Sequence, residues 1–190
     1  VTLRREISRI GARYLVVDSA AGACGGEPER AETAIRYFNA LKALGLPSLT
    51  IAHTTKSGED QRPFGSHFWH LNARLSWNIK ADDNIEDELR IGFFCRKANI
   101  GRRLSPFGMR LGFNNGHIEV GNHSLWYTFG EHLPTKVRIK KLLMAQGKMM
   151  RNEIAEELGM ADNTVRQALK RMPEAKSEGR SRYSRWWISA

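Results

Sequence analysis

Residues 163–172 separate into two faces when they are placed on a helix. Val165, Ala168, Leu169 and Met172 stand at positions i, i+3, i+4 and i+7, which is the spacing of an apolar helical stripe. The side chains between them carry amide, hydroxyl or cationic groups: Asn163, Thr164, Arg166, Gln167, Lys170 and Arg171. Because such a stripe must pack against a partner, we expect a folded domain with the polar face in solvent.

Two further helices are expected before this one. Thr135 is the expected N-cap of a helix that ends at Gly147, and a second helix is expected over 151–158. Asp162 is the expected N-cap of the third helix, and Pro173 is expected to end it.

The segment after Pro173 predicts a β-hairpin, with a turn at Glu178-Gly179 and an aromatic return strand that includes Trp186 and Trp187. We expect each tryptophan to be half in the core and half at the surface. Three short helices followed by a basic hairpin are typical of a winged helix-turn-helix. Residues 150–172 resemble the helix-turn-helix of many bacterial regulators and replication proteins, and a three-helix domain used for protein contacts is the alternative.

Positive charge is concentrated in the same part of the chain. Residues 135–190 contain 13 Lys and Arg against 6 Asp and Glu, whereas residues 1–134 contain 17 against 14. This excess favours a polyanionic partner, and we expect DNA, although solubility alone also accounts for surface charge. The expected DNA contacts are the six polar residues above together with Lys176, Arg180 and Arg182, and Arg185 belongs to the same basic hairpin.

The front of the chain, residues 1–133, predicts an α/β domain, and residues 134–190 are expected to form the second domain. Apolar runs at 14–18 and 49–52 predict two buried parallel strands. Residues 19–26 are expected to form a loop. A helix is expected to begin near Pro28, because Ile35, Phe38 and Leu41 follow at helical spacing, and to stop at Gly45-Leu46-Pro47.

Further strands are expected at 74–80, 89–96, 109–113 and 117–120, as an antiparallel extension of a mainly parallel sheet. Asn114-Asn115-Gly116 predicts a tight hairpin turn between the last two. The acidic stretch 82–88 is interpreted as a solvated turn.

Val16-Val17-Asp18-Ser19 resembles the Walker B strand of the RecA superfamily, and the resemblance extends loosely over residues 10–120. It implies that Asp18 binds the Mg²⁺ ion that accompanies ATP, and that Ser19, which follows it, belongs to the same cofactor site. Hard cations such as Mg²⁺ take oxygen ligands at the ends of parallel strands. The resemblance also implies that His53 senses the γ-phosphate. Residues 63–74 are similar to the Gly-Ser segment of RepA-like ATPases.

Arg96 and Lys97 resemble the basic finger loop of DnaB- and RepA-like enzymes, which reaches the nucleotide of a neighbouring subunit. This implies a homo-oligomer. Asp18, His53 and the Arg96-Lys97 pair are each open to a plainer interpretation, as a capping carboxylate, a strand-end histidine and a solvated basic turn.

The sequence contains no G-x-x-x-x-G-K-[ST] motif, so the phosphate loop of these ATPases is missing. We therefore expect this chain alone to bind no nucleotide productively and to hydrolyse no ATP. The sequence is consistent with the C-terminal part of a RecA-type replication or recombination ATPase of a phage or plasmid. The alternatives are a DNA-binding regulator with a degenerate ATPase domain, a replication adaptor that acts through protein contacts, and a nuclease or transposase.

Several classes are not expected. Cys24 and Cys95 suit a reduced, cytoplasmic protein, and no apolar run approaches the ~18–20 residues of a membrane span. The spacing of His67 and His70 is compatible with two zinc ligands, but no further Cys/His cluster in the sequence completes a set of four, so a zinc site is not expected.

Overall fold

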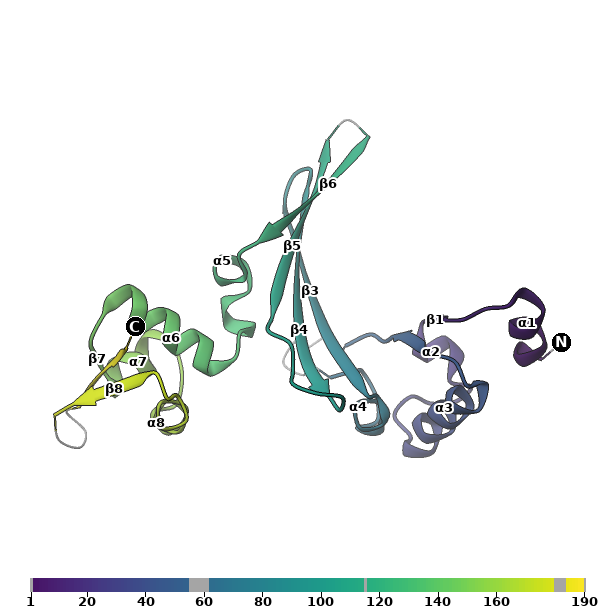
Figure 1. The fold of residues 1–190 in the computed structure, drawn as a ribbon, viewed down its shortest axis with the longest axis horizontal. Coiled ribbons are helices and arrows are strands. Elements are labelled where there is room, and N and C mark those ends of the chain that lie inside the picture. Colours follow the sequence, from purple (N-terminus) through teal and green to yellow (C-terminus); the bar gives the residue numbers. More distant parts are fainter. Residues whose placement is uncertain (1, 55–61, 115, 180–183, 190) are drawn as a thin grey trace. The chain divides into compact units, whose positions relative to one another are not determined.

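The computed structural model of the chain describes residues 2–54, 62–114, 116–179 and 184–189 (Figure 1). The chain is a mixed α/β protein that divides into two compact units. The first unit contains Val1–Asn78 and Cys95–Ser105, and the second contains Ile79–Phe94 and Pro106–Ala190.

The first unit contains a pair of parallel strands, as the sequence predicts, but the expected burial of the first strand is wrong, because Val16 is 57% exposed. Strand β1 (Leu15–Asp18) pairs in parallel with β2 (Ser48–Ile51), with Leu15 opposite Ser48 and Asp18 opposite Ile51. Its helices are α1 (Leu3–Ile10), α2 (Ala20–Ala23), α3 (Ala31–Leu44) and α4 (Phe68–Asn72). Helix α2 occupies part of the segment that was expected to be a loop.

The core of this unit lies between α2, α3 and α4. Tyr37 and Trp69 are buried with their ring centroids 5.1 Å apart. The Trp69 Nε1–H donates to the carbonyl oxygen of Pro28 at 2.8 Å, and the Tyr37 hydroxyl lies 2.8 Å from the Thr50 hydroxyl. The buried polar atoms of these large rings are therefore paired.

The expected start of α3 is wrong, and the side of the helix that faces inward is not the one that carries Ile35. The helix begins at Ala31, three residues after Pro28, which lies in a turn. Ala34 and Tyr37 are fully buried, whereas Ile35 is 38% exposed. Phe38 and Leu41 pack against the edge of the cluster. The partners in α2 and α4 fix which side of α3 faces inward, and the sequence of α3 alone does not contain that information.

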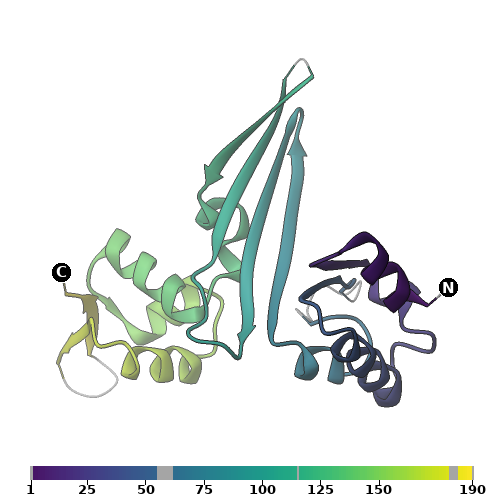
Figure 2. The ribbon, with the colours of Figure 1, turned by 45° about the vertical axis from the view of Figure 1, so that its right-hand side comes forward.

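The antiparallel strands form a sheet of their own among the described residues, and they do not extend the parallel pair. The strands β3 (Leu75–Ile85), β4 (Glu88–Ala98), β5 (Phe107–Asn114) and β6 (His117–His123) stand in sequence order (Figure 2). The β5–β6 register continues to Asn114 opposite His117, which confirms the predicted pairing, and Asn115 at the predicted turn lies outside the described residues.

One face of this sheet is lined with glycine. Gly92 lies opposite Gly108, and the short helix α5 (Leu125–Phe129) packs there around buried Phe94. A Cβ on Gly108 would stand 2.5 Å from the His123 carbonyl oxygen. The absence of side chains is what lets α5 approach the strands. The 3₁₀ turn η1 (Gly130–His132) follows α5.

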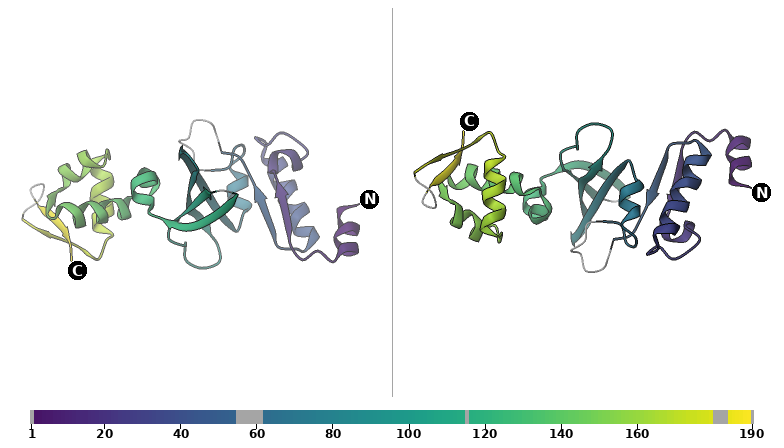
Figure 3. Two further views of the ribbon diagram at one scale, coloured as in Figure 1. Left: turned by 90° about the horizontal axis from the view of Figure 1, so that it is seen from above. Right: turned by 90° about the horizontal axis from the view of Figure 1, so that it is seen from below.

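The C-terminal part of the chain has three helices and a small sheet (Figure 3). The helices are α6 (Thr135–Gln146), α7 (Arg151–Glu157) and α8 (Asp162–Lys170), and the antiparallel strands β7 (Met149–Met150), β8 (Ala175–Glu178) and β9 (Arg185–Ile188) stand in the order β7-β9-β8. Their apolar faces enclose one cluster of buried side chains: Ile139, Leu142, Leu143, Met149, Ile154, Ala155, Val165, Ala168, Leu169 and Met172.

The two expected N-caps are each displaced by one position. Pro134 and Ala161 occupy the N-cap positions, and Thr135 and Asp162 are the first helical residues. Neither helix has a side-chain cap hydrogen bond. The Asp162 carboxylate instead accepts a hydrogen bond from the Arg151 guanidinium at 2.6 Å, so it forms an ion pair with α7 and does not cap α8.

Candidate nucleic-acid interface

Helix α8 has one buried face and one exposed face, as the sequence predicts. Val165 and Leu169 are 0% and 1% exposed, and Met172, just beyond the helix, is also buried. Every polar residue predicted to contact DNA on this segment is solvent-exposed: Asn163, Thr164, Arg166, Gln167, Lys170 and Arg171. The middle of the helix therefore packs through its apolar side, and its polar side is exposed to solvent.

The turn between α7 and α8 fixes the direction in which α8 leaves. Gly159 adopts φ 60°, a left-handed conformation that glycine takes without strain. The backbone N–H of Met160 donates to the Ala155 carbonyl oxygen at 2.8 Å and closes the turn. Since α7 and α8 also share the buried cluster, the exposed face of α8 has a defined orientation within this group of helices.

Cations of α6 stabilise the ends of the other two helices. Lys136 Nζ donates to the Arg171 carbonyl oxygen at 2.6 Å, and Arg138 donates to the Leu158 carbonyl oxygen at 2.8 Å. Carbonyl groups at a helix C-terminus carry partial negative charge, which a cation offsets. These two cations therefore have structural partners.

The cations of α8 are arranged differently. The Arg166 guanidinium donates to Asn163 Oδ1 at 2.7 Å along the exposed face, and this aligns two of the side chains predicted to read bases. Within the described residues, Lys170 and Arg171 form no ion pair with a carboxylate. Their charge is thus not neutralised by an acidic neighbour in that part of the chain.

The hairpin formed by β8 and β9 carries fewer of the predicted contacts within the described residues. Lys176 is exposed, whereas Arg180 and Arg182 lie outside the described residues. Trp186 packs against the buried cluster. Trp187 is half-buried, with Lys148 Nζ 4.6 Å from its ring centroid. Both rings thus have partners within the fold, as the half-buried interpretation predicts.

The residues of the nucleotide resemblance are divided between two places in the first unit. Asp18 is the last residue of β1 and lies opposite Ile51, the last residue of β2. His53 comes two residues after Ile51, so Asp18 and His53 both stand at the carboxyl ends of the two parallel strands. Ser19 stands at the N-cap of α2. The His53 carbonyl oxygen accepts a hydrogen bond from the Phe64 N–H at 2.7 Å.

Arg96 and Lys97 lie within β4 and not on a loop. Lys97 Nζ donates to the carbonyl oxygens of His70 and Leu71 at 3.1 and 2.6 Å, at the end of α4. Arg96 reaches Asn78 Oδ1 at 3.5 Å, and burial, followed by repulsion from Arg103, lowers the pKa of Arg96. Both side chains thus have contacts inside the first unit.

His70 lies among several of these cations. Burial lowers the pKa of His70, and the positive charges of Lys97, His67, Arg62 and Arg103 lower it further. The neutral imidazole is favoured for this reason, and its Nδ1 lies 3.3 Å from the Ser76 hydroxyl.

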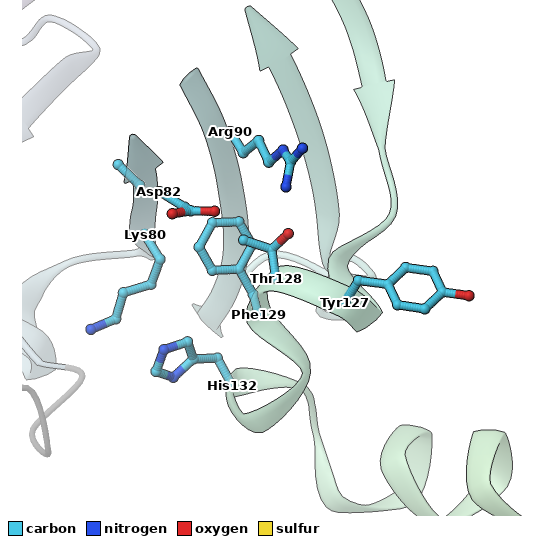
Figure 4. A pocket seen from close by; sticks show the side chains of 8 residues that line it. Lys80, Asp82, Arg90, Tyr127, Thr128, Phe129 and His132 are labelled. Carbon is cyan, nitrogen blue, oxygen red and sulfur yellow. The ribbon is translucent and has the colours of Figure 1, made fainter. Parts of the chain in front are cut away.

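A pocket of about 390 Å³ opens beside α5 in the second unit (Figure 4). Lys80, Asp82 and His132 are among its lining residues, and the Tyr127 ring points away from the other labelled side chains. Arg90 is held by Glu88 at 2.7 Å, and Arg110 lies 3.3 Å from the same carboxylate. The pKa of Glu88 is lowered first by the hydrogen bond from Arg90, and the bond from Arg110 adds to this effect.

Sequence reasoning missed this pocket because its lining comes from β3, β4, α5 and η1, and no local spacing joins these elements. The acidic stretch 82–88, interpreted as a solvated turn, supplies Asp82 to the pocket and Glu88 to the two arginines. Such a mixture of charges suits a small polar ligand with both donor and acceptor groups.

No family model matches this chain, and a search of curated proteins gives no match. Among the described residues, no group of three His, Cys, Asp or Glu side chains is placed to share a metal ion, and both cysteines are free. None of the helices there has the length and apolar character needed to cross a bilayer.

Proposed function

We propose that residues 134–190 bind duplex DNA as a winged helix-turn-helix, with α8 in the major groove and the β8–β9 hairpin against the backbone. One observation carries the proposal: the apolar face of α8 is fully buried, while six hydrogen-bonding or cationic side chains on its other face are exposed. A helix presented in this way fits the major groove, which accepts one α-helix.

Each side chain has a role that follows from its chemistry. Asn163 and Gln167 carry amides, which bind adenine through a donor and an acceptor, and Arg166 matches the two acceptors of guanine. Lys170 and Arg171 end the helix and suit phosphate oxygens, which fix the register on the duplex without reading sequence. The net charge of +7 over residues 135–190 supplies the attraction that does not depend on sequence.

The test is fluorescence anisotropy of the full chain on a duplex of mixed sequence over a range of salt concentrations. Affinity should fall steeply as salt rises. Lys170→Ala should weaken binding and reduce the slope of log K against log salt by about 0.9, the value for one lost phosphate contact. Arg166→Ala should weaken binding with a smaller effect on non-specific duplexes than on a selected sequence.

Lys140→Ala is the matched control, because it removes the same charge from α6, where Lys140 lies 3.8 Å from Glu174. This variant should retain the slope of the unmodified chain. An absence of duplex binding at low salt, or an equal loss in the Lys140 and Lys170 variants, would contradict the proposed interface. The three helices would then serve protein contacts.

A second candidate concerns residues 1–133, for which we propose a portion of a RecA-type ATPase that requires a phosphate-loop-bearing segment. The observation in its favour is the parallel pairing that brings Asp18 and His53 to one strand edge, where the resemblance requires Mg²⁺ and the γ-phosphate sensor. The chain alone should release no phosphate from ATP above background. Release that Asp18→Ala abolishes would overturn this expectation.

A further inference from the structure

The four-stranded sheet has two unlike faces. Residues that lie opposite each other on paired strands point to the same side, and successive residues alternate. Gly92 lies opposite Gly108 and Gly112 opposite Glu119, on the side that carries α5. The intervening residues therefore form the other side.

That other side is mostly apolar on β4, β5 and β6, although Asn122 lies there opposite Met109, and the alternation along β4 continues to Cys95 and Lys97. The paired positions are Phe93 with Phe107, Ile91 with Met109, Leu89 with Leu111, Leu111 with Val120, and Phe113 with Ile118. We refer to these nine residues as the apolar face: Leu89, Ile91, Phe93, Phe107, Met109, Leu111, Phe113, Ile118 and Val120.

Much of the apolar face is open to solvent. Ile118 and Val120 are 65% and 64% exposed, and Phe107 and Phe113 are 46% and 42% exposed. The other five are half-buried, and the rings of Phe93 and Phe107 stack on each other at 4.7 Å. These side chains contact their sheet neighbours, and the exposed fractions of Phe107, Phe113, Ile118 and Val120 show that part of each side chain remains open to solvent.

The exposed area is large for a monomer. If one large apolar residue presents roughly 180 Å² when fully exposed, the apolar face leaves roughly 550 Å² uncovered. This value is near the top of the roughly 300–600 Å² that the largest patch of a monomer reaches. It is also close to the roughly 600 Å² per partner at the lower limit of specific interfaces.

We propose that the apolar face is the contact between two copies of this chain. Nine aliphatic, aromatic and thioether side chains, bordered by Asn122, can meet the same nine side chains of a second copy, as a two-fold symmetric interface requires. Its nine residues include no cation, so it offers nothing to the phosphates of a nucleic acid. Two such sheets pack face to face at about 10 Å, which removes the protruding Ile118 and Val120 from water.

The neighbouring residue Glu119 provides a matched control. Ile118 and Val120 point to the apolar face, and Glu119 between them points to the opposite side of β6 and is exposed. Lysine at any of the three positions lies at the surface of a single copy and should leave its fold intact. Only Ile118→Lys and Val120→Lys place a charge inside the proposed contact, where an unpaired charge is strongly unfavourable.

Sedimentation equilibrium of the full chain over micromolar concentrations tests the proposal, with circular dichroism to check folding. The unmodified chain and Glu119→Lys should be dimeric, and Val120→Lys should raise the dissociation constant at least tenfold. If a lysine variant does not fold, Val120→Thr, which keeps the shape of the side chain, should raise it by a smaller factor. The proposal would be overturned if the unmodified chain were monomeric, or if Val120→Lys and Val120→Thr left the dissociation constant of the dimer unchanged. It would also be overturned if the chain were a monomer that binds lipid vesicles or another protein through this face.

Discussion

Replacing Leu169 by alanine measures how firmly the apolar side of α8 holds the helix that we propose to bind DNA. Leu169 is 1% exposed, so the substitution deletes three buried carbon groups. At about 0.8 kcal/mol for each, transfer alone costs about 2.4 kcal/mol, and the residual cavity brings the expected loss to about 3–4 kcal/mol. Gln167→Ala is the control, because Gln167 is exposed and should change stability by less than about 0.5 kcal/mol.

Hydrogen exchange of the full chain, resolved by mass spectrometry, is the suitable assay, because peptides of α7 and α8 report the opening of this helical group separately from the rest. The free energy of opening should fall by the amounts above in Leu169→Ala and remain nearly constant in Gln167→Ala. Equal effects of the two substitutions would refute the assignment of inner and outer faces. A loss below about 1 kcal/mol in Leu169→Ala would show that the cluster around α8 is loosely packed.

Two further predictions concern the antiparallel sheet. Gly108→Ala should destabilise the second unit by about 1–3 kcal/mol in thermal unfolding, because its new Cβ would overlap the backbone of the segment leading to α5. Gly112→Ala is the control and should be nearly neutral, because its Cβ would make ordinary contacts. Equal effects of the two substitutions would contradict the conclusion that glycine allows α5 to pack closely on the sheet. The lowered pKa of Glu88 stabilises the fold above the ordinary value of 4.5, and this contribution is lost as pH falls through the lowered value. Unfolding followed from pH 7 to pH 3 should therefore show a weaker acid dependence in Glu88→Gln, and an unchanged profile would show that the bonds from Arg90 and Arg110 add nothing.

The parts of the fold predicted from sequence are those that local pattern determines. The stripe at Val165, Ala168, Leu169 and Met172 is confirmed as buried, because four apolar residues at helical spacing can face only one side. The parallel pairing of 15–18 with 48–51 and the β5–β6 hairpin are confirmed for a similar reason, since short apolar runs and turn residues specify strands and their connections.

The errors come from tertiary partners that the local sequence does not specify. The helix at Ala31–Leu44 was expected to begin near Pro28, and its sequence does not show that Ala34 and Tyr37 are buried while Ile35 is 38% exposed, because Trp69 packs against Tyr37 from a distant helix. Asp162 was expected as a cap, but Arg151 binds its carboxylate. The pocket beside α5 could not be predicted, because its lining comes from elements separated by about forty residues in the chain.

Charge and apolar surface are separated in this protein, and the two main proposals use different residues for that reason. The candidate DNA contacts lie on α8 and β8, whereas the apolar face is formed by strands β4, β5 and β6 and contains no charged side chain. A symmetric dimer formed through that face would carry two copies of α8, and two linked sites bind a duplex more tightly than one when both can engage. If the chain proves monomeric, a single α8 with its exposed polar face can still bind DNA. If the chain does not bind DNA, the apolar face can still form a dimer. The two proposals are therefore tested independently by their own experiments.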